Sequence, residues 1–287
     1  MKKFIFTVLS VLIVCVFFAC QKKGQQGQEL QKVPKLKKEA TLVIETYTDS
    51  ARKKVGPIEC TSAITVDYPT KGNKYLLNSI REWIIDWTYA NDSISFDDPV
   101  AILKDYNNNS MKELISMAEE IVSDGNPNNN EREMGYAQEM NIKKIYENDI
   151  LVTYIVTTYG YWGGAHGGAS AWGTTFRKSD GKVLDHIFRN DKLTEVQKMI
   201  TEDLKKYFEV NSWEELREHL FVDEYATEVP MPQADPYIEN DSIVFTYQQY
   251  EIGAYAIGMP GAKIAINDLR DMLAPSFLKI LKPNSTK

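Results

Sequence analysis

Cysteine and histidine are scarce in this chain of 287 residues, which contains three of each. Two of the cysteines lie within the first 20 residues, so Cys60 is the only thiol in the remainder and cannot form an internal disulfide. A zinc site needs several ligands at close spacing, and the three histidines stand apart without a cysteine motif. They are His166, His186 and His219. We therefore expect no metal, no cofactor, and a fold that depends on its hydrophobic core.

Positive charge is also in short supply. The chain has 33 Lys and Arg against 40 Asp and Glu, a formal net charge of −7, and removal of a leader that carries Lys2 and Lys3 makes it −9 (−7 minus 2). Nucleic-acid binding needs Lys and Arg to neutralise phosphates, so we expect no nucleic-acid partner. An acidic protein suits a cationic partner, which it attracts at low salt.

Long apolar runs are absent after the N-terminus, where Phe4 to Phe18 forms a single stretch of 15 residues. A membrane-spanning helix needs about 20 residues, whereas this length is typical of a signal-peptide core. The stretch follows Met1-Lys-Lys and ends in Ala19-Cys20, which resembles a bacterial lipobox with Phe17 in the place of the usual leucine. This resemblance predicts a lipoprotein signal peptide over residues 1–19 and lipidation of Cys20. The alternative is an ordinary cleaved signal with an incidental cysteine.

Residues 20–39 are rich in Gln, Lys and Gly and have almost no apolar side chains. Such a segment cannot bury enough surface to fold, so we expect a disordered tether. Its lysines either rest on anionic headgroups or are simply solvated, and both readings stay open. Gln21 stands where aspartate would retain a lipoprotein in the inner membrane, by resemblance to other lipoproteins. We therefore expect an outer-membrane lipoprotein of the bacterial envelope, facing either the periplasm or the exterior.

The remaining sequence alternates between strand and helix patterns. Expected strands are 40–48, 60–68, 136–146, 150–159, 170–177, 243–250 and 263–266. Expected helices begin after Asn73, at the capping box Ser110–Glu113, at Asp191 or Thr194, after Ser212, and at Asn267 or Asp268. Short polar turns between the strands indicate antiparallel hairpins. We expect an α+β fold, with antiparallel sheets and helices packed on one face, divided into subdomains 40–168 and 169–287.

Two stretches of the sequence echo one another. Tyr146-Glu-Asn-Asp and the apolar residues after it resemble Ile238-Glu-Asn-Asp and its apolar continuation. A duplicated unit of helix and sheet would produce two similar halves of this kind. Convergence on favourable Asn-Asp turn chemistry would also produce it, and both explanations stay open.

A polar loop from Asp124 to Glu131 superficially resembles a calcium loop. Asn129 stands where such a loop needs glycine, and Gly135 stands where it needs a bidentate glutamate. We therefore expect no calcium site.

The stretch Tyr159–Gly168 joins two apolar strands and contains five glycines and three aromatic residues. Glycine allows close approaches that other residues forbid, so the crossing has a specific shape. His166 either contacts a ligand and titrates near neutrality or holds the backbone through a hydrogen bond. The aromatic rings suit sugar faces and protein anchors, or pack in the core, with Trp162 expected to be exposed. The candidate ligand-binding residues are Tyr159, Tyr161, Trp162, His166 and Trp172.

Two segments together resemble a known family. The first is Tyr159–Gly168 followed by Asp180-Gly-Lys-Val-Leu-Asp185, and the second is Gln249–Pro260 followed by Leu269-Arg-Asp-Met-Leu273. They resemble the extracytoplasmic domain of RsiV-like proteins, a region also similar to the non-catalytic part of the PdaC peptidoglycan deacetylase. The resemblance covers roughly residues 40–281, and Ala254 departs from it by replacing a proline.

The resemblance implies a sensor or binding domain outside the membrane. RsiV binds lysozyme and thereby exposes an anti-sigma factor to proteolysis, but only Met1–Lys3 precede the leader here, so we do not expect that mechanism. We expect a non-enzymatic, lipid-anchored protein that binds lysozyme or cell-wall glycan. The alternatives are a cell-wall hydrolase with a site around His166, although no Gly-x-Ser-x-Gly motif occurs, and a purely structural envelope role.

Overall fold

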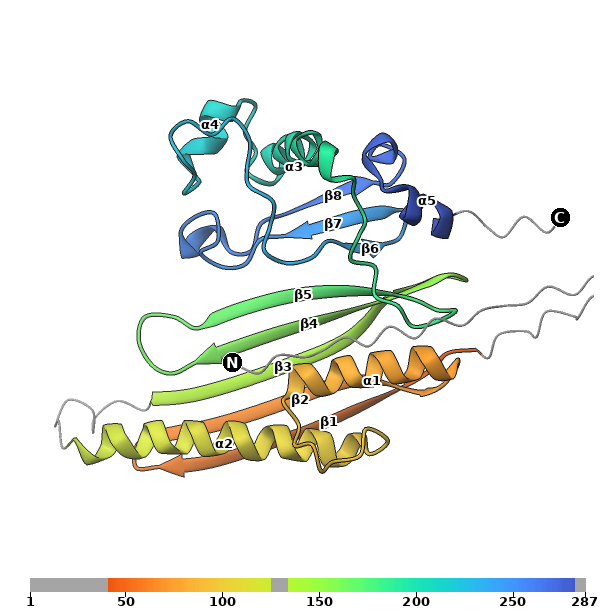
Figure 1. Cartoon of the computed structure of the whole chain (residues 1–287). Coiled ribbons are helices and arrows are strands. Elements are labelled where there is room, and N and C mark those ends of the chain that lie inside the picture. The colour runs from red at the N-terminus through yellow and green to blue at the C-terminus, as the bar shows by residue number, and fades with distance from the viewer. Residues whose placement is uncertain (1–40, 125–133, 282–287) are drawn as a thin grey trace, which may run out of the picture. The chain divides into compact units, whose positions relative to one another are not determined.

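Two β-sheets and the helices packed on them make up the described part of the chain (Figure 1). The computed structural model describes residues 41–124 and 134–281, which belong to one compact unit, Glu39–Lys287. The expected leader, the tether with Cys20, and the calcium-like loop after Asp124 lie outside the described residues. The arrangement confirms the predicted α+β class.

The first sheet has five strands in the order β1-β2-β3-β4-β5. They are β1 (Val43–Val55), β2 (Ile58–Lys71), β3 (Met134–Glu147), β4 (Leu151–Tyr161) and β5 (Gly168–Arg177). The expectation of purely antiparallel pairing is wrong at one place, because β2 and β3 run parallel from Ile58 beside Met134 to Val66 beside Ile142. The reason is the long connection between them: two helices carry the chain back to the same end of the sheet.

These two helices, α1 (Lys74–Thr88) and α2 (Pro99–Ser123), cover one face of the first sheet (Figure 1). As predicted, α1 begins after Asn73, whose side chain accepts a hydrogen bond of 2.9 Å from the Tyr75 N–H. Every second side chain of β2 from Ile58 to Tyr68 is buried beneath the helices, which is the alternation that a half-covered strand requires.

The predicted start of α2 at the Ser110–Glu113 capping box is wrong. The helix begins at Pro99, where Asp98 accepts a 3.0 Å hydrogen bond from the Ala101 N–H, and Ser110 lies buried in mid-helix. Buried Asn107 and Ser110 interrupt the apolar stripe of this helix, so its first turns are not recognisable as part of the same periodic pattern.

The second sheet has the antiparallel order β6-β7-β8, with β6 (Tyr237–Glu239), β7 (Ser242–Thr246) and β8 (Gly261–Ala265). Helix α3 (Leu193–Tyr207) packs on β8, and α4 (Trp213–Glu218) packs on α3. The predicted cap of α4 is confirmed, because Ser212 Oγ accepts a 3.1 Å hydrogen bond from the Glu215 N–H.

The prediction of a helix that begins at Asn267 or Asp268 is wrong in its position. A short 3-10 turn covers Arg270–Met272, and α5 covers Pro275–Leu281. Between them Leu273 is extended and forms a β-bridge with Phe188, which interrupts the helix. Ala274 precedes a proline, and that position disfavours helical backbone.

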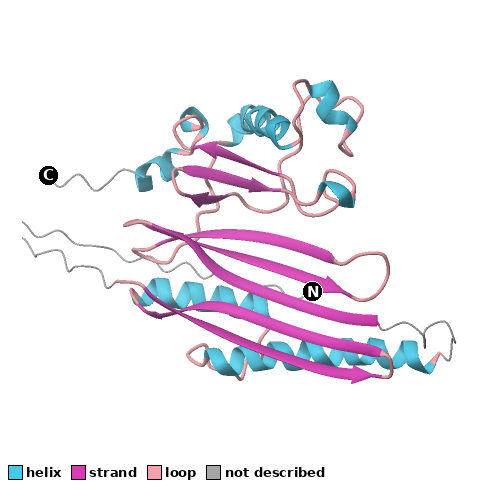
Figure 2. Ribbon diagram, turned by 180° about the vertical axis from the view of Figure 1, so that it is seen from behind, coloured by secondary structure: helices cyan, strands magenta, loops and turns pink. Residues whose placement is uncertain are grey.

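The second sheet lies against β4 and β5 on the side opposite the helices (Figure 2). Thr153 of β4 donates a 2.6 Å hydrogen bond to the Ile238 carbonyl, and the Ile238 N–H donates a 2.9 Å hydrogen bond to Thr175 of β5. These buried contacts join the sheets. The division into subdomains at Gly168 stays a prediction, although β5 itself belongs to the first sheet.

Each of the two Asn-Asp turns joins the first two strands of a three-stranded antiparallel meander, β3-β4-β5 and β6-β7-β8. Asn148 accepts hydrogen bonds of 2.8 Å from the N–H groups of Ile150 and Leu151, and Asn240 adopts a positive φ of 55°. Duplication and convergent turn chemistry both account for this similarity.

Candidate functional site

The crossing between β4 and β5 is shaped by aromatic rings that fold back onto glycines. A Cβ atom at Gly160 would lie 2.2 Å from the ring of Trp162, and one at Gly167 would lie 2.5 Å from the ring of Tyr159. Contacts this short do not occur, so a side chain at either position would displace the aromatic ring beside it. The glycines therefore fix where Tyr159 and Trp162 lie.

His166 is held on three sides. Its Nδ1 lies 3.0 Å from the Gly167 carbonyl, its Nε2 lies 2.9 Å from the Tyr250 hydroxyl, and its ring stacks on Tyr255 with 3.7 Å between centroids. Because a carbonyl only accepts, we assign the proton to Nδ1, and Nε2 then accepts from the Tyr250 hydroxyl. Within the described residues, these contacts are those of a side chain that positions the loop.

Gln248 and Gln249, at the start of the second segment of the resemblance, bond to the free edge of β5. The N–H of Ala169 donates to Gln249 Oε1 at 2.6 Å. The N–H of Ala171 donates to Gln248 Oε1 at 2.9 Å, and Gln248 Nε2 donates back to the Ala171 carbonyl at 2.7 Å. The amide of Gln248 thus pairs with the strand as a neighbouring strand would. The two segments that carry the family resemblance are therefore in direct contact.

A cleft of about 600 Å³ lies beside this contact. Its aromatic lining comes from both helices of the first sheet, from the crossing and from the second segment. These residues are Trp87, Tyr89, Tyr106, Tyr159, Trp162, His166 and Tyr250. Its polar lining residues are Gln138, Glu139, Thr158, Ser170 and Gln249. We call this space the aromatic cleft.

Four large aromatic side chains of the aromatic cleft are exposed to solvent. Their exposed fractions are 84% for Tyr89, 54% for Tyr250, 47% for Trp162 and 40% for Tyr159. The expected exposure of Trp162 is confirmed. Exposed aromatic rings gathered around one hollow are characteristic of a binding surface, because a folded protein otherwise covers such area.

The five sequence-predicted residues do not all meet. Tyr159, Trp162 and His166 line the aromatic cleft. Tyr161 donates a 3.0 Å hydrogen bond to the Gly164 carbonyl within the crossing, and Trp172 packs against Trp87 on the helix-covered face of the sheet. The ligand-binding role of all five stays a prediction.

Several cleft residues were not identified from the sequence. Tyr250 stands in the second segment of the resemblance, which is the signal that could have found it. Trp87 forms part of the apolar stripe of α1, while Tyr106 and Gln138 belong to elements remote in the sequence. Only the parallel crossover brings these residues to the aromatic cleft.

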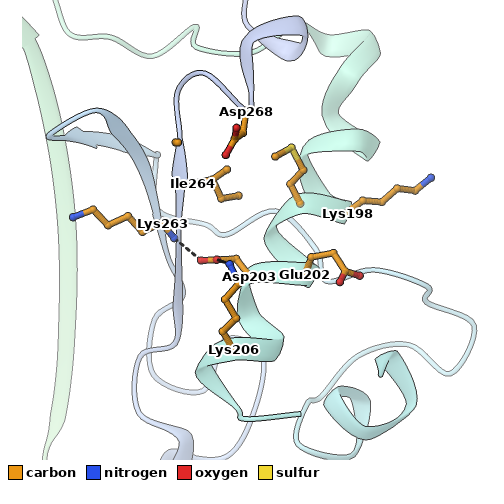
Figure 3. A pocket seen from close by; sticks show the side chains of 9 residues that line it. Lys198, Glu202, Asp203, Lys206, Lys263, Ile264 and Asp268 are labelled. Atoms are coloured by element: carbon orange, nitrogen blue, oxygen red, sulfur yellow. Dashed lines mark hydrogen bonds and ion pairs between the residues drawn. The ribbon is translucent and has the colours of Figure 1, made fainter. Parts of the chain in front are cut away.

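A second pocket, of about 380 Å³, lies between α3 and β8 (Figure 3). Most of its charged side chains are paired: Lys206 Nζ lies 2.7 Å from Asp203 Oδ1, and Lys263 Nζ lies 2.5 Å from Glu239 Oε2. Asp203 also accepts a 2.9 Å hydrogen bond from the Lys263 backbone N–H. Because these charges are satisfied within the protein, we place the candidate site in the aromatic cleft.

Metal-ligating residues and membrane helices were also sought within 41–124 and 134–281. In these ranges no three His, Cys, Asp or Glu side chains gather closely enough to hold a metal ion. None of the helices in the same ranges has the length and apolarity needed to cross a bilayer.

Comparison with known proteins finds similarity to a family of unknown function over part of the chain. Residues 185–267 match the model of DUF3298, a protein family of unknown function. A DUF3298 family member from Bacteroides fragilis has a similar structure, with 20% identity, a TM-score of 0.68, and coverage of 84% of this chain and 98% of that one. A DUF3298 family protein from Pseudomonas aeruginosa PAO1 shares 13% identity with a TM-score of 0.55, over 83% of this chain and 96% of that one. A comparison with curated proteins gives no match.

The family match begins just after β5 and ends just after β8, so it covers the second sheet with α3 and α4. The two solved structures extend the similarity to most of this chain, and at their level of identity the likeness concerns the fold.

Proposed function

We propose that this protein is a lipid-anchored binding protein of the bacterial envelope, and that its aromatic cleft binds cell-wall glycan without catalysing a reaction. The leader and Cys20 support the anchoring, and the composition of the aromatic cleft supports the ligand. The first support comes from the sequence and the second from the fold, so each is tested separately.

The observation that carries the proposal is the set of four exposed aromatic rings around the aromatic cleft, Tyr89, Tyr159, Trp162 and Tyr250. Sugar rings have apolar C–H faces that pack on aromatic rings, and hydroxyl edges that need polar partners. Gln138 and Glu139 provide polar groups next to the rings. A glycan matches this alternation of flat apolar surface and polar groups.

A positively charged protein such as lysozyme is the second candidate ligand. The formal net charge of −7 favours attraction of a cationic protein, and the resemblance to RsiV points to the same partner. Exposed tyrosine and tryptophan side chains also anchor protein interfaces.

A hydrolase with its site at His166 is less well supported. Glycoside hydrolysis typically uses two carboxyl groups on either side of the scissile bond. Among the described residues that line the aromatic cleft, Glu139 is the one carboxylate. His166 in addition is engaged by Gly167, Tyr250 and Tyr255, which favours a positioning role.

Co-sedimentation of the full chain, in detergent micelles, with insoluble peptidoglycan tests the proposal. We expect binding that persists at high salt and falls about tenfold or more in Trp162→Ala, since loss of an exposed aromatic anchor costs about 1–3 kcal/mol. Tyr225→Ala is the control, because Tyr225 is 83% exposed and does not line the aromatic cleft. Binding of lysozyme alone, lost at high salt, would favour the second candidate; binding of neither would refute both.

A further inference from the structure

Gln138 has an unusual environment in the aromatic cleft. It lies on β3, with Ser62 of β2 and Gly160 of β4 as its neighbours in the sheet register. Its Oε1 atom is buried and has no hydrogen-bond partner among the described residues. A buried acceptor without a donor destabilises a fold, so its presence at a cleft indicates a partner that binds there.

Neighbouring buried polar groups are satisfied within the protein. Ser62 Oγ donates a 2.6 Å hydrogen bond to Asn107 Oδ1, and Asn107 Nδ2 donates a 2.8 Å hydrogen bond to Asp49 Oδ2. This network runs between β1, β2 and α2, directly beside Gln138 in the sheet. Two buried side-chain polar atoms among the described residues have no hydrogen-bond partner, Gln138 Oε1 and the Tyr154 hydroxyl oxygen, and of these two residues Gln138 lines the aromatic cleft.

Four other polar side chains of the cleft lining are engaged within the protein. Gln249 Oε1 accepts from the Ala169 N–H, and the hydroxyls of Thr158 and Ser170 lie 2.7 Å apart and bond to each other. The Tyr250 hydroxyl bonds to His166. Gln138 Oε1 by contrast has no hydrogen-bond partner among the described residues.

We infer that Gln138 determines specificity for N-acetylated sugars by accepting a hydrogen bond from the N–H of their acetamido group; this rests on the proposed glycan-binding function. An amide N–H donates and has no lone pair of its own, whereas a hydroxyl would bring lone pairs that need further donors. Apolar surface from Trp87, Tyr106 and Met140 lines the same cleft and suits the acetyl methyl group.

Calorimetric titration of the full chain in detergent micelles with two trisaccharides tests the inference. Chitotriose carries an acetamido group on every ring, and cellotriose has hydroxyls at those positions. We expect the wild type to prefer chitotriose by about tenfold, the effect of one hydrogen bond to a buried amide. Gln138→Met keeps the length of the side chain and removes the acceptor, so the preference should disappear.

The matched control is Gln233→Met, because Gln233 is exposed and does not line the aromatic cleft. It should keep the preference. Thermal unfolding gives a second readout: Gln138→Met should be at least as stable as the wild type, because the substitution removes an unsatisfied buried group.

Each outcome is decisive. Equal affinity of the wild type for both sugars, or a preference that survives Gln138→Met, would overturn the role of Gln138 and leave the proposed function standing. A general folding defect would lower both affinities together and leave their ratio intact, which also counts against the inference. Failure of the wild type to bind either sugar, together with failure to bind peptidoglycan, would refute the proposed function itself.

Discussion

The imidazole of His166 stacks on the phenol ring of Tyr255 with 3.7 Å between centroids and 16° between planes. His166 belongs to the loop between β4 and β5, and Tyr255 belongs to the segment between β7 and β8. The stack therefore joins a loop of the first sheet to a loop of the second, at one side of the aromatic cleft.

Replacement of His166 by alanine should loosen this junction. The variant loses the stack and the bonds to Gly167 and Tyr250, so the free energy of unfolding should fall by about 1–2 kcal/mol. Denaturant unfolding measures the fall, and peptidoglycan binding should weaken in parallel. His186→Ala is the control, since 91% of the His186 side chain is exposed, and it should change neither quantity. Equal effects of the two substitutions would contradict the role assigned to His166.

The Gly160→Ala substitution should displace the Trp162 ring, which packs on Gly160 of β4. The new Cβ would lie 2.2 Å from the indole ring, and overpacking of this kind typically costs about 1–3 kcal/mol. We expect a lower free energy of unfolding, a changed near-ultraviolet circular dichroism spectrum and weaker glycan binding.

Gly168→Ala is the matched control for Gly160→Ala. A Cβ at Gly168 meets no atom within 4 Å, although Gly168 pairs with Gly160 across the two strands. The control should keep the wild-type free energy of unfolding and near-ultraviolet spectrum. A Gly160→Ala variant with an unchanged spectrum and full stability would show that Trp162 does not lie on Gly160.

Gln248→Leu should uncouple the second segment from the edge of β5. The substitution removes two hydrogen bonds to Ala171 and leaves that backbone N–H and carbonyl without partners, at a cost of about 1–3 kcal/mol. Hydrogen exchange should show faster exchange of the Ala171 amide. Gln233→Leu, at an exposed position, should leave this amide unchanged; identical exchange in both variants would exclude the pairing.

The sequence revealed the two segments of the aromatic cleft but not the cleft itself. Tyr159–Gly168 is recognisable because its five glycines and three aromatic residues lie close together in the sequence. Its glycines Gly160 and Gly167 contact aromatic rings of the same stretch, so this part of the site is determined locally. Trp87 and Tyr106 in contrast follow ordinary helical patterns. Their place in the aromatic cleft depends on the parallel pairing of β2 with β3, which no local pattern specifies.

The start of a helix was predicted correctly where one capping residue precedes one apolar stripe. The prediction was wrong where a second capping motif lies inside the helix. Asn73 and Ser212 each precede a single apolar stripe, and both predicted helix starts are confirmed. Ser110–Glu113 fits a capping box but lies inside α2, because a helix also buries polar residues when a network such as that of Asn107 satisfies them.

High pH should destabilise the protein through its buried tyrosines. Burial raises the pKa of Tyr68 to about 12, and burial raises that of Tyr154 well above its ordinary value. A phenol whose pKa is raised in the folded state binds its proton more tightly there than in the unfolded chain, where the pKa is near 10. The stabilisation is complete below pH 10 and is lost as the pH rises towards 12.

Denaturant unfolding between pH 8 and pH 11 measures this loss. Tyr68→Phe should be less stable at pH 8, because it loses the hydrogen bond to the Phe96 carbonyl, and its stability should decline less steeply above pH 10. The control Tyr225→Phe, at an exposed position, should show the wild-type slope. A Tyr68→Phe variant with the full wild-type slope would contradict the contribution of Tyr68.

Cys20→Ser tests the lipid anchor. Without the thiol no acyl chain can be attached there, so the protein should leave the membrane fraction of expressing bacteria and lose incorporation of labelled fatty acid. Cys15→Ser keeps the proposed acylation site and should remain in the membrane fraction. Equal membrane association of both variants would favour an ordinary signal with an incidental cysteine.

Hydrogen exchange of the full chain with and without soluble peptidoglycan fragments tests the central claim most directly, because it locates the bound glycan. The account predicts slower exchange in the crossing Tyr159–Gly168 and around Tyr250, with no change in α3 and β8. Protection confined to the pocket between α3 and β8, or no protection at saturating glycan, would contradict it.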